Sequence, residues 1–502
     1  MLLGAVSCGE KAEGNKLIIL HTNDTHSQIE PGGDGLGGVM RRKAVIDSVR
    51  AAEKNVLLVD AGDAVQGTLF FYLYGGLVEQ EIMNILDVDM RILGNHEFDN
   101  GCDSLAAVLR HSKAQKLASN YKLDGSALAD QFEPYTIREF GGKKIGFIAL
   151  NLNPEGIITK GNYDGVEFLP IVATANLMAE KLKKEDKVDA VIALSHIGYN
   201  PAGLVGDSIL AMNSRNIDVI IGGHSHDVIN PATENGARRS RMTNLDGKPV
   251  LVVQTGKAGR YLGKIELNLD SLGTALPGYE LIKIDGRYDG YRDEALASTL
   301  EQYTSGVDSL MHEWVAYAPE AMSNKSTELQ NFFADYVFLR GKELDGATDF
   351  AIINKGSLRA DIPQGKVSEG HIINMEPFRN YINVVEIKGS DIQDIFDVMA
   401  TTDGNGISRN VRASFGKKDG KAYAAGITID GKPLDPSATY RVATIDYLAK
   451  GGDYMTGFTR GKVVAKSPNA VFDDLLYYFR EGAGKGKDFT GSPENRWTPI
   501  QK

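Results

Sequence analysis

The sequence contains little cysteine: only Cys8 and Cys102 occur among 502 residues. Two cysteines cannot build a disulfide framework, although a single bond between them remains possible. No run of about 20 apolar residues occurs, so the sequence predicts no membrane-spanning helix. Proline is also scarce, with 16 residues against 56 glycines. That ratio favours tight turns over extended linkers.

Positive charge is in deficit, because 55 Lys and Arg residues face 66 Asp and Glu residues, which gives a net charge of −11. So acidic a chain is a poor non-specific binder of nucleic acid or anionic lipid, and we expect no nucleic-acid partner. A small anionic substrate is compatible with this charge if bound metal ions reverse the local field. The hydrophobic fraction of 42% and the charged fraction of 24% are those of a globular protein.

The N-terminus begins with a short apolar run that ends in Ser7 and Cys8. The run resembles the end of a bacterial lipoprotein signal, in which the cysteine carries lipid, although it lacks a basic region. We therefore expect residues 1–15 to be a signal remnant or lipoprotein tether, with a lipid anchor at Cys8 and an extracytoplasmic, periplasmic or membrane-anchored protein. The alternative is a frayed N-terminus with a free thiol.

The first half of the chain alternates strand-like and helix-like patterns. Runs rich in Leu, Ile and Val occupy residues 17–20, 56–59, 145–150, 188–194, 217–221, 250–253 and 262–269. Amphipathic segments at 38–53 and 173–184 lie between them. Buried strands alternating with amphipathic helices predict a layered α/β domain, which we place at residues 16–285.

The composition then changes. Residues 272–290 are rich in Gly and Asp, and residues 291–317 show apolar side chains at helical spacing. We expect a linker helix within residues 286–318 and a second domain at 319–502. In that second domain a helix is expected at 327–340 and strands at 350–354, 384–388 and 440–445.

Polar side chains follow five apolar runs, four of those above and a fifth at residues 90–93, at the point where each run ends. These are Asp24 and His26, then Asp63, then Asn95 and His96, then His196, and finally His224 and His226. Ligands bind at the carboxyl edge of α/β sheets, so neighbouring strand ends can bring such groups together. The sequence therefore predicts a polar site at this edge.

Asp, Asn and His without cysteine suit Zn, Mn or Fe. The pairs Asp24/His26 and His224/His226 have a spacing of two, which places both members on one side of an extended segment. A single His-x-His pair is more often a surface or structural feature. Five such sites in one order favour a metal centre instead.

The order of these motifs resembles the calcineurin-like metallophosphoesterases, whose blocks read Asp-x-His, Gly-Asp, Gly-Asn-His-Glu, His and Gly-His-x-His. The amino-acid sequences at 22–26, 94–99 and 222–227 are similar to the corresponding motifs of the 5′-nucleotidase family. The resemblance continues in the second half at 354–359 (Asn-Lys-Gly-Ser-Leu-Arg), 377–380 (Pro-Phe-Arg-Asn) and 447–453 (Tyr-Leu-Ala-Lys-Gly-Gly-Asp). It covers nearly all of residues 16–464.

The resemblance implies an α/β fold: an N-terminal metallophosphoesterase β-sandwich flanked by helices, a connector helix, and a C-terminal α/β nucleotidase domain. It also implies two divalent metal ions, with Zn or Mn expected. One ion is held by Asp24, His26, Asp63 and His226, and the other by Asp63, Asn95, His196 and His224. Asp63 would bridge them, as two-metal hydrolytic sites require.

The resemblance further assigns His96 and Asp99 as a catalytic pair, in which Asp99 orients the imidazole. The alternative makes Asp99 only a helix-start residue. Arg359 is expected to bind phosphate, because a guanidinium suits bidentate contact. The remaining expected nucleotide contacts are Asn354, Phe378, Asn380, Tyr447 and Asp453. Phe378 and Tyr447 would sandwich the base, Asn380 would bind its edge and Asp453 would bind the ribose.

Three positions depart from the family pattern: Lys355 and Arg379 replace glycines, and Tyr447 replaces the commoner Phe. They leave the base preference open.

By resemblance, the function is a 5′-nucleotidase that hydrolyses nucleoside 5′-monophosphates to nucleoside and phosphate, by attack of a metal-bound hydroxide, with the active site between the two domains. The alternatives are a 2′,3′-cyclic-nucleotide phosphodiesterase or nucleotide-sugar hydrolase, and a non-enzymatic surface module that binds nucleosides. The sequence does not indicate the oligomeric state.

Overall fold

The computed structural model describes residues 15–201 and 203–500, which form two compact units. Unit 1 comprises residues 15–66, 74–154 and 161–303, and unit 2 comprises residues 67–73, 155–160 and 304–500. The expected tether with its lipid anchor at Cys8 lies outside the described residues, apart from Asn15. Within the described part of the chain, no helix combines the length and the apolar character needed to cross a bilayer.

Unit 1 contains two large sheets. The first has the strand order β15-β14-β1-β2-β3-β4 and the second the order β11-β13-β10-β9-β7-β6, with β12 paired to β13. The first sheet consists of β1 (Lys16–Thr22), β2 (Val56–Asp60), β3 (Met90–Arg91), β4 (Gln115–Lys116), β14 (Tyr261–Asn268) and β15 (Gly278–Lys283). The second consists of β6 (Tyr135–Phe140), β7 (Lys143–Asn151), β9 (Ala190–His196), β10 (Val219–Ile221), β11 (Val228–Ile229), β12 (Arg241–Thr243) and β13 (Pro249–Thr255). The short strands β5 (Tyr121–Lys122) and β8 (Glu167–Phe168) pair separately.

The two sheets form a sandwich around one apolar core. Alternate residues of β1, such as Leu17 and Ile19, are fully buried there together with Phe147 of β7 and Ile192 of β9. The intervening residues Ile18 and Leu20 are also fully buried, because helices cover the outer face of the sheet. This double burial explains why the strands appear in the sequence as continuous apolar runs. The expected β-sandwich is therefore confirmed.

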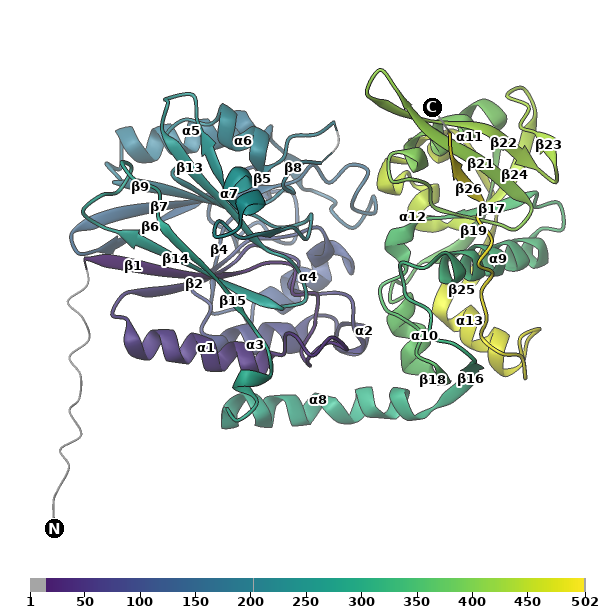
Figure 1. Ribbon diagram of the computed structural model, residues 1–502, viewed down its shortest axis with the longest axis horizontal. Coiled ribbons are helices and arrows are strands. Elements are labelled where there is room, and N and C mark those ends of the chain that lie inside the picture. Colours follow the sequence, from purple (N-terminus) through teal and green to yellow (C-terminus); the bar gives the residue numbers. More distant parts are fainter. Residues whose placement is uncertain (1–14, 202, 501–502) are drawn as a thin grey trace, which may run out of the picture. The chain divides into compact units, whose positions relative to one another are not determined.

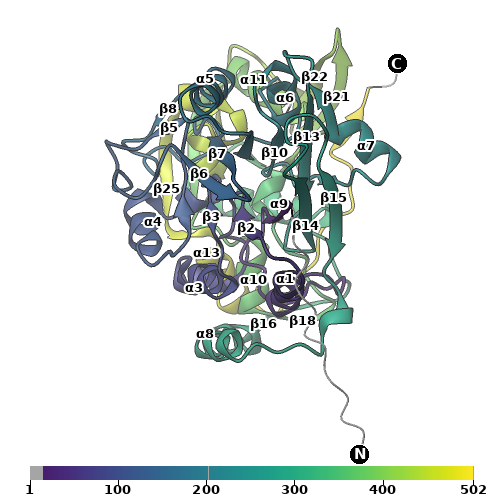
Figure 2. The same ribbon diagram turned by 90° about the vertical axis from the view of Figure 1, so that its left-hand side faces the viewer.

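Helices cover both outer faces of the sandwich. Figures 1 and 2 show α1 (Val39–Ala52) and α3 (Leu77–Leu86) on the side of the first sheet, and α5 (Ile171–Lys184) and α6 (Asp207–Asn213) on the side of the second. The expected amphipathic helices at 38–53 and 173–184 correspond to α1 and α5. The other helices of this unit are α4 (Gly101–Leu109) and α7 (Glu234–Ser240), with the 3₁₀ turns η1 (His96–Phe98) and η2 (Gly286–Tyr288).

Unit 2 is also α/β. Its main sheet has the order β20-β17-β24-β19-β25, and α9 (Thr327–Leu344) packs on it around a second apolar core. These strands are β17 (Phe350–Ile353), β19 (Tyr381–Lys388), β20 (Gly406–Ile407), β24 (Thr439–Ile445) and β25 (Lys462–Ala470). A second sheet contains β21 (Val411–Lys418), β22 (Lys421–Ile429), β23 (Lys432–Pro433) and β26 (Trp497–Pro499).

The remaining elements of unit 2 are mostly helical. They are α10 (Glu369–Met375), α11 (Gly389–Ala400), α12 (Asp446–Ala449) and α13 (Val471–Arg480), the turns η3 (Lys355–Ser357), η4 (Gly452–Tyr454) and η5 (Thr456–Arg460), and the strand β18 (Gly365–Ser368). The short helix α2 (Leu69–Tyr74) and the long helix α8 (Glu294–His312) each contain a boundary between the units.

The long helix expected at residues 291–317 is shorter in the structure. It begins at Glu294, after Asp293, whose side chain accepts the N–H of Leu296 at 2.8 Å. It ends at His312, and β16 (Trp314–Ala318) follows, paired antiparallel with β18. Aromatic and β-branched residues at 314–317 favour a strand over a helix end, and this preference prevailed over the helical spacing.

Candidate metal centre

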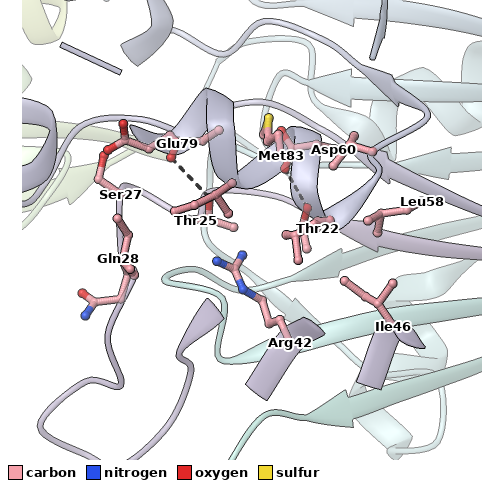
Figure 3. A pocket seen from close by; sticks show the side chains of 15 residues that line it. Thr22, Thr25, Ser27, Gln28, Arg42, Ile46, Leu58, Asp60, Glu79 and Met83 are labelled. Carbon is pink, nitrogen blue, oxygen red and sulfur yellow. Dashed lines mark hydrogen bonds between the residues drawn. The ribbon is translucent and has the colours of Figure 1, made fainter. Parts of the chain in front are cut away.

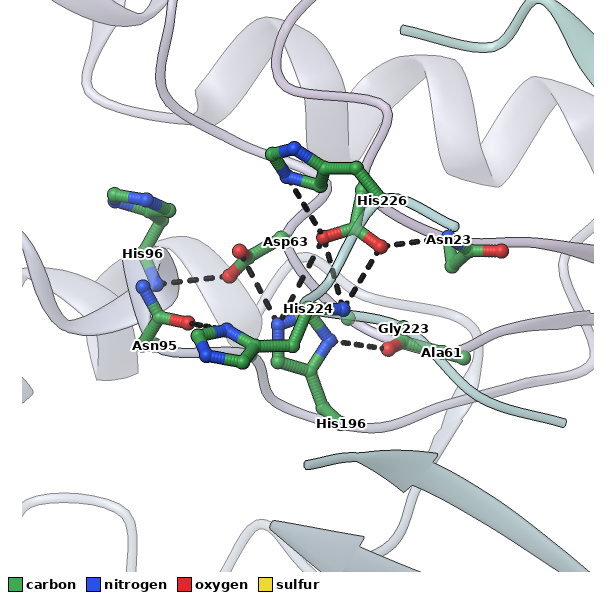
Figure 4. Close-up of polar contacts among 12 residues, drawn as sticks. Asn23, Ala61, Asp63, Asn95, His96, His196, Gly223, His224 and His226 are labelled. Atoms are coloured by element: carbon green, nitrogen blue, oxygen red, sulfur yellow. Dashed lines mark hydrogen bonds and ion pairs between the residues drawn. The ribbon is translucent and has the colours of Figure 1, made fainter. Parts of the chain in front are cut away.

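The five strand ends that the sequence singled out meet at one edge of the sandwich. The parallel strands β1, β2 and β3 carry Asp24, His26, Asp63 and Asn95 from the first sheet. The parallel strands β9 and β10 carry His196, His224 and His226 from the second. Figure 4 shows Asp63, Asn95, His196, His224 and His226 of this set converging. The prediction that the polar groups gather at the carboxyl edge is confirmed.

One part of that prediction is wrong. The Asp24/His26 and His224/His226 pairs are not on extended segments, because all four residues have positive φ, between 49° and 75°. Asp63 joins them with a φ of 54°. Non-glycine residues in this region are strained and persist only where the surroundings fix them, which is frequent at functional sites.

The turns also place the two histidines of the second pair differently. The ligand atoms fall into three overlapping groups, each within 4.8 Å: Asp24, His26 and His226; Asp63, His196 and His224; and His26, Asp63 and His96. His224 and His226 thus belong to different groups, while Asp63 belongs to two. A carboxylate shared in this way is what a bridging ligand between two cations requires.

Several close contacts within the centre join possible ligand atoms to one another. The Nε2 atoms of His26 and His226 lie 2.9 Å apart. Nδ1 of His224 lies 2.8 Å from Oδ1 of Asn95, and Nε2 of His196 lies 3.2 Å from Oδ2 of Asp63. Such a concentration of lone pairs is typical of a site built for cations.

Three further observations indicate that these residues suit divalent metal ions. Nε2 of His196 is fully buried, and among the described residues its contact is Oδ2 of Asp63 at 3.2 Å, without the geometry of a hydrogen bond, while its Nδ1 lies 2.7 Å from the carbonyl oxygen of Ala61. That second contact fixes the tautomer that leaves Nε2 as a ligand. A Cβ at Gly94 would come 2.1 Å from Oδ1 of Asp63, and one at Gly223 would come 3.1 Å from Oδ2 of Asp24. The carboxylates therefore need glycine beside them.

Protonation in the metal-free centre reflects its charges. Burial alone would raise the pKa of Asp63, but the neighbouring imidazoles, His196 first, hold it well below its usual range. Burial would lower the pKa of His196, but Asp63 outweighs it and raises that pKa to about 10. Burial lowers the pKa of His224 to about 4. Because imidazole binds a metal ion only in its deprotonated form, binding of a cation at His196 would release a proton.

His96 and Asp99 lie together at the rim of the centre. Nδ1 of His96 is 2.8 Å from Oδ2 of Asp99, and both side chains are partly exposed. The N–H of His96 also donates to Oδ1 of Asp63 at 2.9 Å. Asp99 follows the 3₁₀ turn His96–Phe98 at its C-terminal end, so it does not start that turn.

The sequence gave no role to Glu97, which the structure places directly behind the ligands. Its buried carboxylate accepts the backbone N–H groups of Asp63 and Ala64, both at 3.0 Å, and that of Gly94 at 2.6 Å. Arg91 contacts the same carboxylate at 3.3 Å. The sequence feature that could have indicated a role for Glu97 is its position inside the Gly94–Asp99 motif.

Asp207 was also missed. Its buried carboxylate accepts the hydroxyl of Ser195 at 2.7 Å and the amide of Gln254 at 3.1 Å, and Gln254 also donates to the carbonyl of Gly223. Burial raises the pKa of Asp207 to about 7. These contacts fix the chain next to His196 and His224. No local pattern in the sequence marks Asp207.

The residues expected to bind the nucleotide all lie in unit 2. Asp453 joins two of them, because its carboxylate accepts Nδ2 of Asn354 at 2.7 Å and the hydroxyl of Tyr447 at 2.8 Å. The guanidinium carbon of Arg359 lies 5.8 Å from the ring centre of Phe378. The structure thus brings Asn354, Tyr447 and Asp453 together, and Arg359 and Phe378 together.

Asn380 differs from its expected role in one respect. Its side-chain NH₂ donates to Oε1 of Glu376 at 2.9 Å, so part of its hydrogen-bonding capacity is already used. Burial raises the pKa of Glu376 well above its usual range.

Two of the departures from the family pattern are accommodated locally. The ammonium of Lys355 donates to the carbonyl of Thr402 at 2.7 Å. The hydroxyl of Tyr447 both donates to the Asp453 side chain and accepts its backbone N–H at 3.1 Å. A Cβ at Gly452 would come 2.5 Å from the ring of Tyr447, so glycine is required there. Arg379 is exposed.

Comparison with known proteins agrees with this geometry. The family model of calcineurin-like phosphoesterases matches residues 17–228, and that of the 5′-nucleotidase C-terminal domain matches residues 313–460. The chain is 28% identical to snake venom 5′-nucleotidase of Naja atra, over 87% of this chain and 90% of that protein. It is 27% identical to the 5′-nucleotidase of Homo sapiens, over 87% and 83% respectively.

The chain is also 27% identical to the trifunctional nucleotide phosphoesterase protein YfkN of Bacillus subtilis, over 88% of this chain but 32% of that longer protein. Among solved structures, a 5′-nucleotidase precursor from Thermus thermophilus superposes with a TM-score of 0.84 at 28% identity, covering 97% of this chain and all of the other. The sulfate thiohydrolase SoxB of Thermus thermophilus shares the fold at 16% identity, with a TM-score of 0.77 and 98% of each chain covered. The chain belongs to the family of calcineurin-like phosphoesterases that carry a 5′-nucleotidase C-terminal domain.

Proposed function

We propose that this protein is a metal-dependent 5′-nucleotidase that converts nucleoside 5′-monophosphates to nucleoside and phosphate. The observation that carries the proposal is the intact centre, in which Asp63 is shared between groups of possible metal ligands. The similarity to 5′-nucleotidases over most of the chain supports the nucleotide as substrate. It favours this function over the cyclic-nucleotide, nucleotide-sugar and non-enzymatic alternatives.

We assign one cation to Asp24, His26, Asp63 and His226, and the second to Asp63, Asn95, His196 and His224. Bound divalent ions lower the pKa of a water and neutralise charge on the phosphoryl group. Zn and Mn both suit these ligands. Asn95 contributes a neutral oxygen, which limits the negative charge that the ligands bring to the centre.

Side chains of the protein are assigned to charge stabilisation and to substrate binding. Asp99 holds Nδ1 of His96 and so orients the ring, and we assign the imidazole to stabilising charge that develops on the phosphate or the leaving oxygen. In unit 2, Arg359 is assigned to the phosphate, since a guanidinium binds its oxygens in pairs. Phe378 and Tyr447 are assigned to the base, Asp453 to the ribose, and Asn354 and Asn380 to further polar contacts. This assignment keeps the boundaries 16–285, 286–318 and 319–502 for the phosphoesterase domain, the linker and the nucleotide-binding domain.

The test follows both inorganic phosphate and nucleotide products after the Mn- or Zn-loaded protein is incubated with AMP, GMP, CMP, UMP, a 2′,3′-cyclic nucleotide or UDP-glucose. Nucleotide products are needed because one hydrolysis of the cyclic nucleotide or of UDP-glucose leaves each phosphate on an organic group. The Asn95→Ala/His96→Ala variant serves as the blank. Release from the monophosphates that disappears in the blank supports the proposal and ranks the bases. Hydrolysis of only the cyclic nucleotide or UDP-glucose, seen as their nucleotide products without phosphate release from the monophosphates, contradicts it.

We also propose an extracytoplasmic location, periplasmic or on a membrane through lipid at Cys8. The apolar run that ends at Cys8 supports this proposal. Incorporation of labelled palmitate into the native protein, lost in Cys8→Ser, is the expected result. Equal labelling of both proteins contradicts anchoring at Cys8.

A further inference from the structure

The strand β13 ends at the edge of the sandwich where the metal centre lies, but it carries none of the assigned ligands. It runs parallel to β10, so its carboxyl end lies next to the turn 223–227, which carries His224 and His226. The last residue but one of the strand, Gln254, is polar and fully buried. Buried polar side chains are hydrogen-bonded as a rule, so the partners of Gln254 show what it supports.

Gln254 uses both ends of its amide. The NH₂ group donates to the carbonyl of Gly223 and to Oδ2 of Asp207, both at 3.1 Å. The amide oxygen accepts the backbone N–H of Asp227 and the hydroxyl of Ser225, both at 3.2 Å. One side chain thus contacts the turn at its beginning, its middle and its end.

The orientation of this amide follows from the backbone groups around it. An N–H only donates and a carbonyl only accepts, so the oxygen of Gln254 must face Asp227 and its NH₂ group must face Gly223. The second hydrogen of the NH₂ group then points to Asp207. That carboxylate is itself fully buried, and its other oxygen accepts the hydroxyl of Ser195 at 2.7 Å. Asp207 therefore supports the orientation in which Gln254 holds the turn.

The turn 223–227 carries one assigned ligand for each cation. His226 lies in the group of Asp24, and His224 lies in the group of Asp63. Both histidines have positive φ, 75° for His224 and 56° for His226. Non-glycine residues in this conformation persist only where their surroundings fix them. The contacts that fix this one turn therefore act on both cation positions.

The other strained turn, which carries Asp24 and His26, is fixed by backbone hydrogen bonds. The N–H groups of Asp24, His26 and Ser27 donate to the carbonyls of residues 62–64, at 2.9 to 3.0 Å. A cavity of about 30 Å³ lies beside this turn, and Figure 3 shows Thr25 and Ser27 among the side chains that line it. This turn therefore keeps its conformation without close side-chain packing on that side.

The turn 223–227 depends on side chains instead. Before Asp227, the hydrogen bond that joins two backbone groups among the described residues lies inside the turn, from the N–H of Ser225 to the carbonyl of Gly223 at 3.0 Å. The contacts of this segment with the rest of the described chain involve side chains, and Gln254 is the one that reaches both of its ends.

We propose that Gln254 is a positioning residue: oriented by Asp207, it fixes the left-handed turn 223–227 and so sets the affinity of both cation positions. The inference rests on the proposed function only in that it takes His224 and His226 as metal ligands. It requires nothing of the substrate.

The test removes the contacts of Gln254 and then restores them in exchanged form. Gln254→Met keeps the length of the side chain and loses all four contacts, so we expect Mn²⁺ to bind about tenfold more weakly in both positions. Asp207→Asn/Gln254→Glu exchanges the donor and the acceptor between the two residues and leaves the total charge unchanged. We expect this variant to bind Mn²⁺ within about threefold of the native protein, because only the contact to Gly223 is then missing.

Mn²⁺ binding to the metal-free protein is measured by calorimetric titration, which is independent of nucleotide turnover. If the native protein binds Mn²⁺ but releases no phosphate from nucleotides, the proposed function fails while this test stands. Asp218→Asn is the matched control. Asp218 lies directly before β10, at the other end of the same sheet, and accepts the N–H of Val191 at 2.8 Å. This variant is expected to lower the thermal midpoint without changing the Mn²⁺ affinity.

Weak binding by Gln254→Met together with recovery in the exchanged variant supports the inference. If Gln254→Met does not fold, Gln254→Asn replaces it with the same expected loss, because its shorter side chain does not reach all four partners. Native affinity in the Gln254 variant, or a loss confined to one of the two positions, overturns the inference. So does an exchanged variant that does not fold or that binds Mn²⁺ as weakly as the single variant.

Discussion

The carboxylate of Glu97 accepts the backbone N–H of Asp63 at 3.0 Å, and the side chain of Asp63 is the carboxylate that two groups of possible metal ligands share among the described residues. The two oxygens of Glu97 also hold Ala64 and Gly94. Asp63 has a positive φ, so this contact fixes a strained residue at the point where both cations would meet.

Replacement of Glu97 is therefore predicted to loosen the metal centre without touching a ligand. Glu97→Gln replaces one oxygen with an NH₂ group that cannot accept the N–H groups now bound there. We expect Mn²⁺ affinity to fall about tenfold or more, as for other groups that support metal ligands. Metal content after dialysis measures it. The exposed Glu133→Gln is the control, and unchanged metal retention in Glu97→Gln would show that Asp63 does not depend on this contact.

Removal of the charge on Asp99 should affect turnover and not metal binding. Asp99→Asn keeps the size of the side chain but weakens its hold on Nδ1 of His96, 2.8 Å away. We expect kcat for AMP to fall about 10²-fold, the usual size of a general acid–base contribution, with two metal ions still bound. The control is Asp103→Asn on the exposed face of α4. Native turnover in Asp99→Asn would leave Asp99 a purely structural residue.

His21 makes unit 1 sensitive to acid. The imidazole is fully buried in the sandwich, neither nitrogen is hydrogen-bonded to any residue that the structure describes, and burial lowers its pKa to about 3. The unfolded chain, with an ordinary pKa near 6.5, binds the proton first as the pH falls. The stability is therefore complete above about pH 6.5 and is lost progressively toward pH 3.

The His21→Phe variant is predicted to remove this slope. At pH 4.5 the native protein should have lost about 3 kcal/mol through His21 that the variant keeps. Urea unfolding of the metal-free proteins at pH 4.5 and 7.5 measures the difference. His111→Gln, at an exposed position, should leave the pH dependence unaltered. Parallel pH profiles for native protein and His21→Phe would refute the prediction.

The hydroxyl of Tyr447 orients Asp453, since it donates to its carboxylate at 2.8 Å and accepts its N–H at 3.1 Å. Tyr447→Phe keeps the ring and loses both contacts. We expect KM for AMP to rise about tenfold, the value of a hydrogen bond to a charged group, with kcat within about twofold. Tyr477→Phe, on an exposed ring, is the control. A fall in kcat at unchanged KM would contradict a binding role for this contact.

Much of the site could be predicted because strand ends are readable in the sequence. The apolar runs before Asp24, Asp63 and His196 are strands whose carboxyl ends share one edge. The position of these residues after the runs therefore predicted where in the fold they lie. The backbone of the site could not be predicted. Left-handed conformations at Asp24 and His224 are imposed by contacts from distant segments, such as Gly62 to Asp24, and leave no local pattern.

Supporting residues escaped prediction for a related reason. Asp207 and Gln254 have no distinctive neighbours in the sequence, and their importance comes only from what the fold places beside them. The strand at Trp314–Ala318 escaped because helical spacing continued up to it, and its pairing partner lies about fifty residues further along the chain.

The number of metal ions needed for turnover tests the central claim most directly. Phosphate release from AMP is measured while Mn²⁺ is added to metal-free protein at concentrations far above its dissociation constant. A rate that rises to a plateau at two equivalents per chain is the predicted result. A plateau at one equivalent, or release that does not depend on metal, would contradict a centre in which Asp63 joins two cations.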